Sequence, residues 1–284
     1  MKRALSVLVW GGWLCLPLAG GAQSLTFGRL PISLIEQRLQ RLAKDNAERG
    51  TILHTLFSEA GCREHLTLQQ VRGSRVPNVI CILPGTDDQW IVVGAHFDKA
   101  AASAEGAVDN WSGASLLPSL FASLARHPRR HKFVFIGFTD EERGLVGSSF
   151  YVSRLSKEER AKVRAMINID SVGLTSTKVW VSRADKELLS LLGRLANGMK
   201  FPVDGVSVEN VGNSDSYHFV RNKIPVIDFH SITQPTLELL HSPRDILAAV
   251  SLEDYYTTYE LLAAYLAFLD FSLDSNSPPS QADR

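Results

Sequence analysis

Four clusters of histidine and acidic residues contain the side-chain types that bind metal ions and transfer protons. Three of them directly follow strongly apolar runs, namely His96-Phe97-Asp98, Asp140-Glu141-Glu142 and the single Asp170. The fourth, at residues 106–110, contains Asp109 and opens a helical pattern. Carboxylates gathered in one place repel each other or are poorly solvated unless a cation joins them. The pattern therefore predicts a site for a pair of divalent metal ions.

Each cluster also has a purely structural interpretation. His96 is compatible with a hydrogen-bonded structural histidine, and Asp109 is compatible with a helix cap. The adjacent Glu141 and Glu142 are compatible with a solvated first helical turn, which the helix dipole favours. Together with Asp170, however, these residues occur in order along the chain, mostly after a strand or at a helix start. That combination favours the metal site over the separate structural interpretations.

Apolar runs and helical patterns alternate along the chain. Runs typical of strands span residues 66–71, 78–83, 90–95, 132–138, 163–169, 178–182 and 224–229. Helical patterns span residues 34–43, 51–60, 115–125, 144–155, 186–199 and 252–269. The alternation predicts an α/β fold, a single domain with a mixed, largely parallel β-sheet flanked by helices. Ligands bind at the carboxyl ends of the strands in such sheets, and the polar clusters are expected there.

Five motifs together resemble the signatures of metallopeptidase family 28. They are His96-Phe97-Asp98, the stretches 106–113 and 141–148, Asn168-Ile169-Asp170, and the stretch 241–245 with the sequence HSPRD. The resemblance runs from about Pro77 to the final helix, and the combination is far more specific than any single motif. The family includes bacterial leucyl aminopeptidases and the related glutaminyl cyclases. The resemblance implies a zinc exopeptidase fold.

The resemblance also implies a set of metal ligands. Asp109 would bridge two zinc ions, His96 and Asp170 would complete one site, and Glu142 and His241 would complete the other. Imidazole and carboxylate ligands suit zinc, and three protein ligands leave a position open for water. Two metal ions can lower the pKa of that water and polarise the scissile carbonyl.

Two further acidic residues are implied to act without binding metal, and the role of a third is left open. Glu141 would be the general base that takes the proton of the water and passes it to the leaving amine. Asp98 would orient the imidazole of the metal-binding histidine. The family often has a histidine directly after the aspartate that corresponds to Asp215, whereas Ser216 follows here and His218 comes two residues later. The sequence leaves Asp215 open between a loop turn and a group that supports the metal ligands or the substrate amine.

The activity implied is that of a two-zinc aminopeptidase acting on peptides with a free N-terminus. The alternative is a glutaminyl-peptide cyclase, which would share the ligands while using one zinc. Asp109-Asn110 followed by Ser112-Gly113 resembles the peptidase form more closely. A non-catalytic binding module of the same fold should have lost a ligand or the base, whereas all six candidates are present. The sequence indicates neither a preferred N-terminal residue nor an oligomeric state.

The first residues have the pattern of an export signal. Lys2 and Arg3 precede an apolar stretch at residues 4–19, and small residues follow at 20–22. The stretch is shorter than the ~20 apolar residues of a spanning helix. We therefore expect a signal peptide at 1–22, a zinc peptidase domain at 23–273, a disordered tail at 274–284 and a periplasmic or extracellular location.

Cysteine content and charge add two expectations. Cys62 and Cys81 are the only cysteines outside the expected signal, and an oxidising compartment favours a disulfide between them. Two separate buried thiols are the alternative. The chain has 30 basic and 30 acidic residues, so no basic excess points to nucleic acid as a partner.

Overall fold

The computed structural model describes residues 14–15, 24–25, 27–100, 104–208 and 212–273. Apart from residues 14–15, the expected signal peptide lies outside these residues, as does the expected tail at 274–284. Within the described part of the chain, no helix combines the length and the apolar character needed to cross a membrane. The assignment of residues 23–273 to one catalytic domain stays a prediction.

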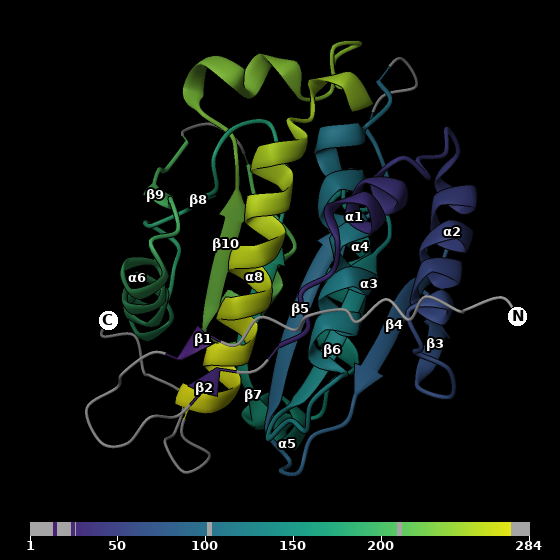
Figure 1. The fold of residues 1–284 in the computed structure, drawn as a ribbon. Helices are drawn as coiled ribbons and strands as arrows, with labels where there is room; N and C mark the ends of the chain where they lie inside the picture. The colour runs from purple at the N-terminus through teal and green to yellow at the C-terminus, as the bar shows by residue number, and fades with distance from the viewer. Residues whose placement is uncertain (1–13, 16–23, 26, 101–103, 209–211, 274–284) are drawn as a thin grey trace, which may run out of the picture.

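A mixed sheet of eight strands forms the centre of the fold (Figure 1). Its strands, in spatial order, are β3 (Leu66–Gln69), β4 (Asn78–Leu83), β6 (Lys132–Phe138), β5 (Trp90–His96), β7 (Val163–Ile169), β10 (Val226–His230), β8 (Lys178–Val179) and β9 (Asp204–Gly205). The four strands β6, β5, β7 and β10 are mutually parallel. The pairs β3–β4, β4–β6 and β10–β8 are antiparallel, and β9 pairs parallel with β8. The predicted mixed, largely parallel sheet is confirmed. A separate two-stranded pair joins β1 (Leu14–Cys15) and β2 (Ser24–Leu25).

Helices cover both faces of this sheet. The larger apolar cluster joins one face to α1 (Ile32–Leu39), α2 (Asn46–Glu59), α3 (Ser112–Leu124), α6 (Lys186–Met199) and α8 (Leu252–Ser272). Figure 1 shows α3 and α8 lying across this face. The smaller cluster joins the other face to α4 (Val146–Arg154) and α7 (Ser216–Arg221). The burial of both faces explains why the central strands are almost continuously apolar.

Several element boundaries differ from the prediction. Helix α2 begins five residues earlier than expected, because the Asp45 side chain accepts hydrogen bonds from the N–H groups of Ala47 and Glu48. Helix α3 begins at Ser112 and contains Pro118 in its interior, although the sequence favoured a later start. The short helix α5 (Lys157–Lys162) was not predicted. It is polar and has no buried residue, so hydrophobic periodicity gives no signal for it.

Cys62 and Cys81 form a disulfide, with their Cα atoms 6.1 Å apart. Both residues are buried, and the bond ties the chain just after α2 to the middle of β4. The predicted pairing is therefore present in the fold.

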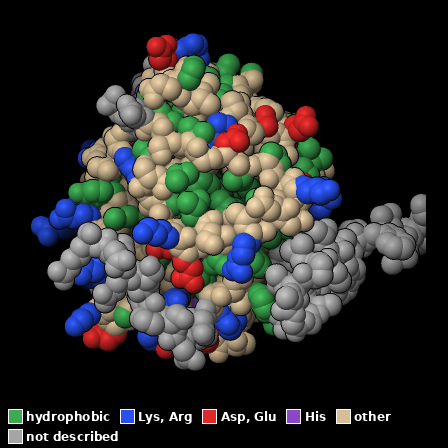
Figure 2. Space-filling view, turned by 90° about the vertical axis from the view of Figure 1, so that its left-hand side faces the viewer, with side chains coloured by type: hydrophobic (Ala, Val, Ile, Leu, Met, Phe, Trp, Pro, Cys, Tyr) green, Lys and Arg blue, Asp and Glu red, His purple; other side chains and the backbone are tan. Residues whose placement is uncertain are grey.

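On the surface, the face shown in Figure 2 has basic and acidic side chains interspersed around a central group of hydrophobic ones.

Side chains of β7 alternate between the two faces of the sheet, and its polar residues point to one of these faces. Ile167 and Ile169 belong to the larger apolar cluster, whereas Met166 belongs to the smaller cluster on the other face. Because side chains alternate along a strand, Asn168 and Asp170 lie on the same side as Met166. Asn168 and Asp170 therefore lie on the face of the sheet that packs against α4 and α7. They follow the apolar residues of that face toward the carboxyl ends of the strands.

Candidate metal centre and active site

The five predicted metal ligands come from different elements that meet at one edge of the sheet. His96 is the last residue of β5, and Asp170 directly follows β7. Glu142 lies in the turn after β6. Asp109 lies in the segment η1 (Ala107–Trp111) that precedes α3, at a position where the backbone departs from helical geometry. His241 follows the 3-10 helix η2 (Gln234–Leu239). Since β6, β5 and β7 are parallel neighbours, their carboxyl ends bring three of these side chains together.

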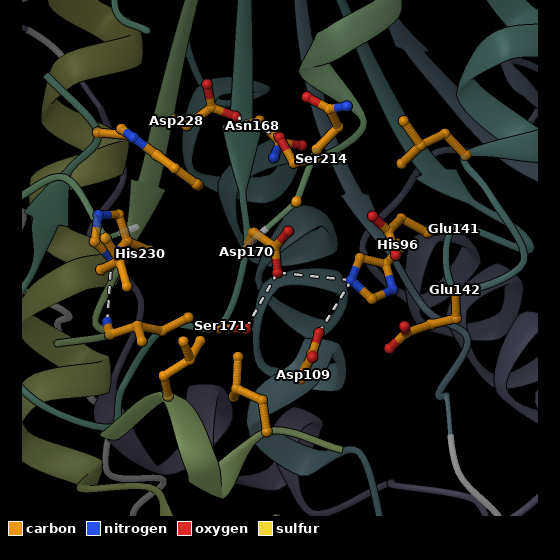
Figure 3. A pocket seen from close by; sticks show the side chains of 18 of the residues that line it. His96, Asp109, Glu141, Glu142, Asn168, Asp170, Ser171, Ser214, Asp228 and His230 are labelled. Carbon is orange, nitrogen blue, oxygen red and sulfur yellow. Dashed lines mark hydrogen bonds and ion pairs between the residues drawn. The ribbon is translucent and has the colours of Figure 1, made fainter. Parts of the chain in front are cut away.

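Asp109 is shared by two groups of possible ligands (Figure 3). On one side, His96 Nε2 lies 3.2 Å from Asp109 Oδ1 and 3.6 Å from Asp170 Oδ1. On the other side, His241 Nε2 lies 3.0 Å from Asp109 Oδ2 and 3.1 Å from Glu142 Oε2. Within each group of three residues, one potential ligand atom per residue lies within 4.8 Å of the others. The arrangement is that of two adjoining three-ligand cation sites with one common carboxylate.

The electrostatics of these residues fit divalent cations. Hydrogen bonds to Asp109 and Glu142 raise the pKa of His241 to about 10. Burial alone would lower the pKa of His96, yet the negative charge of Glu141 and hydrogen bonds to nearby carboxylates raise it well above its usual value. Glu142 Oε1 is buried without a hydrogen-bond partner among the described residues. The excess negative charge, the orphaned oxygen and the imidazole–carboxylate donor set all suit zinc.

Asp98 connects the histidine to the two glutamates. Its carboxylate oxygens accept hydrogen bonds from the backbone N–H groups of Glu141, at 3.1 Å, and Glu142, at 3.2 Å. His96 Nδ1 lies 3.2 Å from the Asp98 carbonyl oxygen and 3.5 Å from its Oδ1. Asp98 thus contacts the ring nitrogen Nδ1, whereas Nε2 is turned toward the candidate cation sites. A residue that orients a metal-binding histidine is expected at the ring nitrogen that does not bind the metal.

Glu141 and Asp215 are acidic residues held in a poorly solvated environment. Burial raises the pKa of Glu141 to about 9, with His96 opposing the rise and the charge of Asp215 adding to it. Burial likewise raises the pKa of Asp215 to about 7. Asp215 lies in the turn directly before α7 and is 1% exposed, so its carboxylate is buried. His218 lies one helical turn further, where its ring packs against Tyr217.

Arg49 of α2 supports the site but lies outside the sequence motifs, so it was not among the predicted site residues. Its guanidinium is fully buried and donates hydrogen bonds to the carbonyl oxygens of Ala43, Phe97, Glu105 and Gly106. Arg49 therefore ties the start of α2 to the end of β5 and to the segment that precedes Asp109. Its partners are backbone carbonyls, so no side-chain pattern in the sequence signals these contacts.

A cavity of about 580 Å³ opens over the candidate metal ligands. Its wall includes His96, Asp109, Glu141 and Glu142, and it extends past Asp170 toward β10 and β8. This volume falls within the range of small-molecule and substrate pockets. The cavity is therefore large enough to hold a small organic ligand next to the candidate cation sites.

Comparisons with known proteins give matches of sequence and of structure. The sequence profile of the family described as Peptidase family M28 matches residues 78–266. Aminopeptidase YwaD of Bacillus subtilis is 29% identical over 181 residues, which cover 61% of this chain and 40% of the relative. Leupeptin-inactivating enzyme 1 of Streptomyces exfoliatus is 30% identical over 154 residues, which cover 52% of this chain and 34% of the relative. The chain thus spans about two fifths or less of the length of these curated relatives.

Solved structures support the fold assignment. The zinc aminopeptidase BSAP of Bacillus subtilis aligns with a TM-score of 0.61 at 26% identity, covering 67% of this chain and 49% of that one. The glutaminyl cyclase of an Acidobacteriales bacterium aligns with a TM-score of 0.68 at 18% identity, covering 83% of this chain and 92% of that one. At that identity the second likeness concerns the fold alone.

Proposed function

The chain belongs to peptidase family M28, and from this premise we propose that it is a zinc-dependent aminopeptidase that releases N-terminal residues from peptides. The observation that carries the proposal is the position of Asp109 between two groups of ligands. His96 and Asp170 would hold one zinc ion together with Asp109, while Glu142 and His241 would hold the second. The relatives named aminopeptidase and zinc aminopeptidase support this assignment.

The residues of the chain divide the remaining tasks. Zinc at these positions would polarise the scissile carbonyl and lower the pKa of the attacking water. Glu141 forms a possible ligand group only with His96 and Glu142 and belongs to neither group around Asp109, so with zinc ions in those two groups its carboxylate would be left to act as the general base. It would take the proton of the water and deliver it to the leaving amine. Asp98 would keep the imidazole of His96 oriented, because it contacts the Nδ1 side of that ring.

A glutaminyl-peptide cyclase with a single zinc is the alternative activity. Its support is the fold-level likeness to a bacterial glutaminyl cyclase. The presence of Asp170 beside His96 and Asp109 favours the peptidase, because these three residues provide a full second set of ligands. Peptides with N-terminal glutamine separate the two activities, since the peptidase releases the residue and the cyclase closes it into a ring.

We further propose that the protein is exported to the periplasm or the extracellular space. Two observations support this location: the charged and apolar pattern of residues 1–22 and the disulfide between Cys62 and Cys81. Disulfides of this kind persist in oxidising compartments.

The test combines metal content with product analysis. The purified protein is reconstituted with zinc, and elemental analysis should find about two zinc ions per chain. Peptides with a free N-terminus should release free amino acids, and the same peptides with an acetylated N-terminus should not. A limit of one metal ion per chain, with ring closure of N-terminal glutamine, would identify the cyclase instead. Release from acetylated peptides would contradict an aminopeptidase.

A further inference from the structure

The inner end of the 580 Å³ cavity is polar, and it lies away from the candidate metal ligands. Asn168 precedes Asp170 by two residues on β7, which places it about 7 Å deeper along the same face of the sheet. Asp228 of β10 is the direct register partner of Asn168. Parallel register partners have their side chains on the same face, so these two lie next to each other. Figure 3 shows Asp228, Asn168 and Ser214 gathered beyond Asp170, on the side opposite Asp109.

The polar atoms at this inner end are incompletely satisfied. Asp228 is 3% exposed, and its Oδ1 accepts a hydrogen bond from the Ser214 hydroxyl at 2.9 Å; the neighbouring Ser216 and Asn168 side chains also favour its charged form. Its Oδ2 and both polar atoms of the Asn168 amide have no hydrogen-bond partner among the described residues. Buried polar groups are nearly always paired, and unpaired ones call for an explanation. Because Asn168 and Asp228 both line the cavity, a ligand that reaches its inner end would meet these two side chains.

The charge of this end is acidic. Burial raises the pKa of Asp228, as expected for a carboxylate without a nearby cation. None of the described residues that line the cavity is lysine or arginine. Burial lowers the pKa of His230, which comes two residues after Asp228 on β10, so its imidazole does not supply the missing positive charge. A cationic group of a ligand would be complementary to Asp228.

Apolar side chains also line the cavity, namely those of Leu145, Trp180, Val208, Ile232 and Leu240. A cavity with these side chains on its walls and a carboxylate at its inner end fits a long aliphatic stem with a cationic tip. Lysine carries its ammonium on a flexible four-carbon stem, and arginine has a comparable reach.

We propose that this cavity receives the side chain of the N-terminal residue of the substrate and that Asp228, with Asn168, selects lysine and arginine there. The inference rests on the proposed aminopeptidase function and adds the substrate class. Asp228 Oδ2 would accept a hydrogen bond from the ammonium or guanidinium, and the Asn168 oxygen would accept a second one. The N-terminal amine and the scissile carbonyl would then lie beside Asp170 and the candidate cation sites.

The test compares anilides of lysine, arginine, norleucine and glutamine. Norleucine has the stem of lysine without the ammonium, and glutamine has a neutral polar tip. In the wild-type protein, kcat/KM for lysine should exceed that for norleucine about ten- to hundredfold, the range of one charge-assisted hydrogen bond. Asp228→Asn should bring this ratio close to one, because lysine loses a charge-assisted hydrogen bond that norleucine never forms. Asp228→Glu keeps the charge and should retain a preference for cationic residues.

Glu238→Gln is the matched control. Glu238 is an exposed carboxylate in η2, between the cavity-lining residues Leu237 and Leu240. Removing its charge tests whether negative charge near the mouth is enough to attract cationic substrates. The ratio of lysine to norleucine should stay within about twofold of the wild type, because exposed charges are screened by salt. A binding measurement complements the kinetics: lysine amide should raise the melting temperature of the wild type more than norleucine amide does, and this difference should vanish in Asp228→Asn.

The outcomes separate the two proposals. Failure to hydrolyse any of the four anilides contradicts the aminopeptidase function itself. Hydrolysis with equal kcat/KM for lysine and norleucine, or with glutamine preferred to lysine, overturns only the inference on specificity. A wild-type preference for lysine that persists in Asp228→Asn assigns the selection to another group and also overturns it. If Asp228→Asn does not fold, the wild-type ratio and the Asp228→Glu variant decide.

Discussion

The carboxylate of Asp245 holds the backbone of Asp109, the residue shared by the two candidate cation sites. Asp245 Oδ2 accepts a hydrogen bond from the Asp109 N–H at 3.2 Å, and Oδ1 accepts one from the Val108 N–H at 2.7 Å. Asp245 is 1% exposed. Arg49 binds the carbonyl oxygen of Gly106 from the other direction. The segment that presents the shared carboxylate is thus fixed by two buried charged side chains from distant parts of the chain.

Asp245→Ala should therefore weaken both folding and metal binding. The substitution leaves two buried N–H groups without an acceptor, which costs about 1–3 kcal/mol of unfolding free energy. Zinc affinity should fall because Asp109 loses its fixed position. Urea unfolding and zinc titration measure the two effects. The control is Glu64→Gln, a substitution at an exposed carboxylate, which should leave both unchanged. Unaltered zinc affinity in Asp245→Ala would remove this residue from the support of the site.

The sequence predicted that the candidate metal ligands lie close together, but it did not predict the residues that support them. His96, Glu142 and Asp170 each follow an apolar strand, and parallel strands bring their carboxyl ends to one edge, so their proximity follows from pattern alone. Arg49 and Asp245 act through backbone atoms of segments remote in the sequence. Which carbonyl or N–H groups they meet depends on the packing of α2 and of the C-terminal loop, which no residue pattern encodes.

The position of Asp228 next to Asn168 could not be predicted either, because it depends on the register between two strands. Asp228 interrupts an apolar run and gives no indication of its neighbour on the next strand. Only the pairing of β10 with β7 places it opposite Asn168. A shift of one residue would turn Asp228 to the other face of the sheet, where it would enter the larger apolar cluster. The sequence could identify β10 as a strand, but not the cavity that the strand helps to form.

The disulfide between Cys62 and Cys81 should contribute to stability. The two cysteines are 19 residues apart, and closing a loop of this size constrains the unfolded chain by about 3 kcal/mol. The double variant Cys62→Ser, Cys81→Ser should unfold at a correspondingly lower urea concentration. Peptide mapping after alkylation without reductant should recover the two cysteines in one linked peptide. Recovery of both as alkylated thiols would show that the bond does not form in the protein.

Asp270 should make stability depend on pH in the acidic range. Its carboxylate accepts hydrogen bonds from the N–H groups of His131, at 2.8 Å, and Arg130, at 3.2 Å. Burial alone would raise the pKa of Asp270, but hydrogen bonds from His131 and Arg130 lower it below its usual value. A lowered pKa in the folded state means that the ionised carboxylate stabilises the fold above the pKa of the unfolded chain, near 3.9. This stabilisation is lost as the pH falls through the folded-state pKa.

Asp270→Asn should accordingly cost about 1–3 kcal/mol of unfolding free energy at pH 7. The difference from the wild type should shrink as the pH falls below about 4, where the wild-type carboxyl also loses its charge. Urea unfolding at a series of pH values measures this difference. The conservative change Glu64→Gln at an exposed site serves again as the control. A difference that stays constant between pH 7 and pH 3 would mean that the charge of Asp270 does not contribute.

The adjacent Glu141 and Glu142 should respond differently to the same substitution. Glu142 Oε2 lies 3.1 Å from His241 Nε2 in one of the two groups around Asp109, so Glu142→Gln should lower zinc occupancy. Glu141 stands outside both of those groups, and Glu141→Gln keeps the size and polarity of the side chain while removing its basicity. If Glu141 is the general base, zinc content and folding should be retained, while turnover falls by about two to four orders of magnitude.

Steady-state hydrolysis of an amino-acid anilide and elemental zinc analysis, both carried out on each variant, distinguish these two roles. Each variant is the control for the other, because both replace a buried or half-buried glutamate of the same turn by glutamine. Loss of turnover with full zinc content in Glu141→Gln, against loss of zinc in Glu142→Gln, is the expected result. Near-normal turnover in Glu141→Gln would mean that another group takes the proton. The buried Asp215, whose charge raises the pKa of Glu141, would then be the residue to replace next.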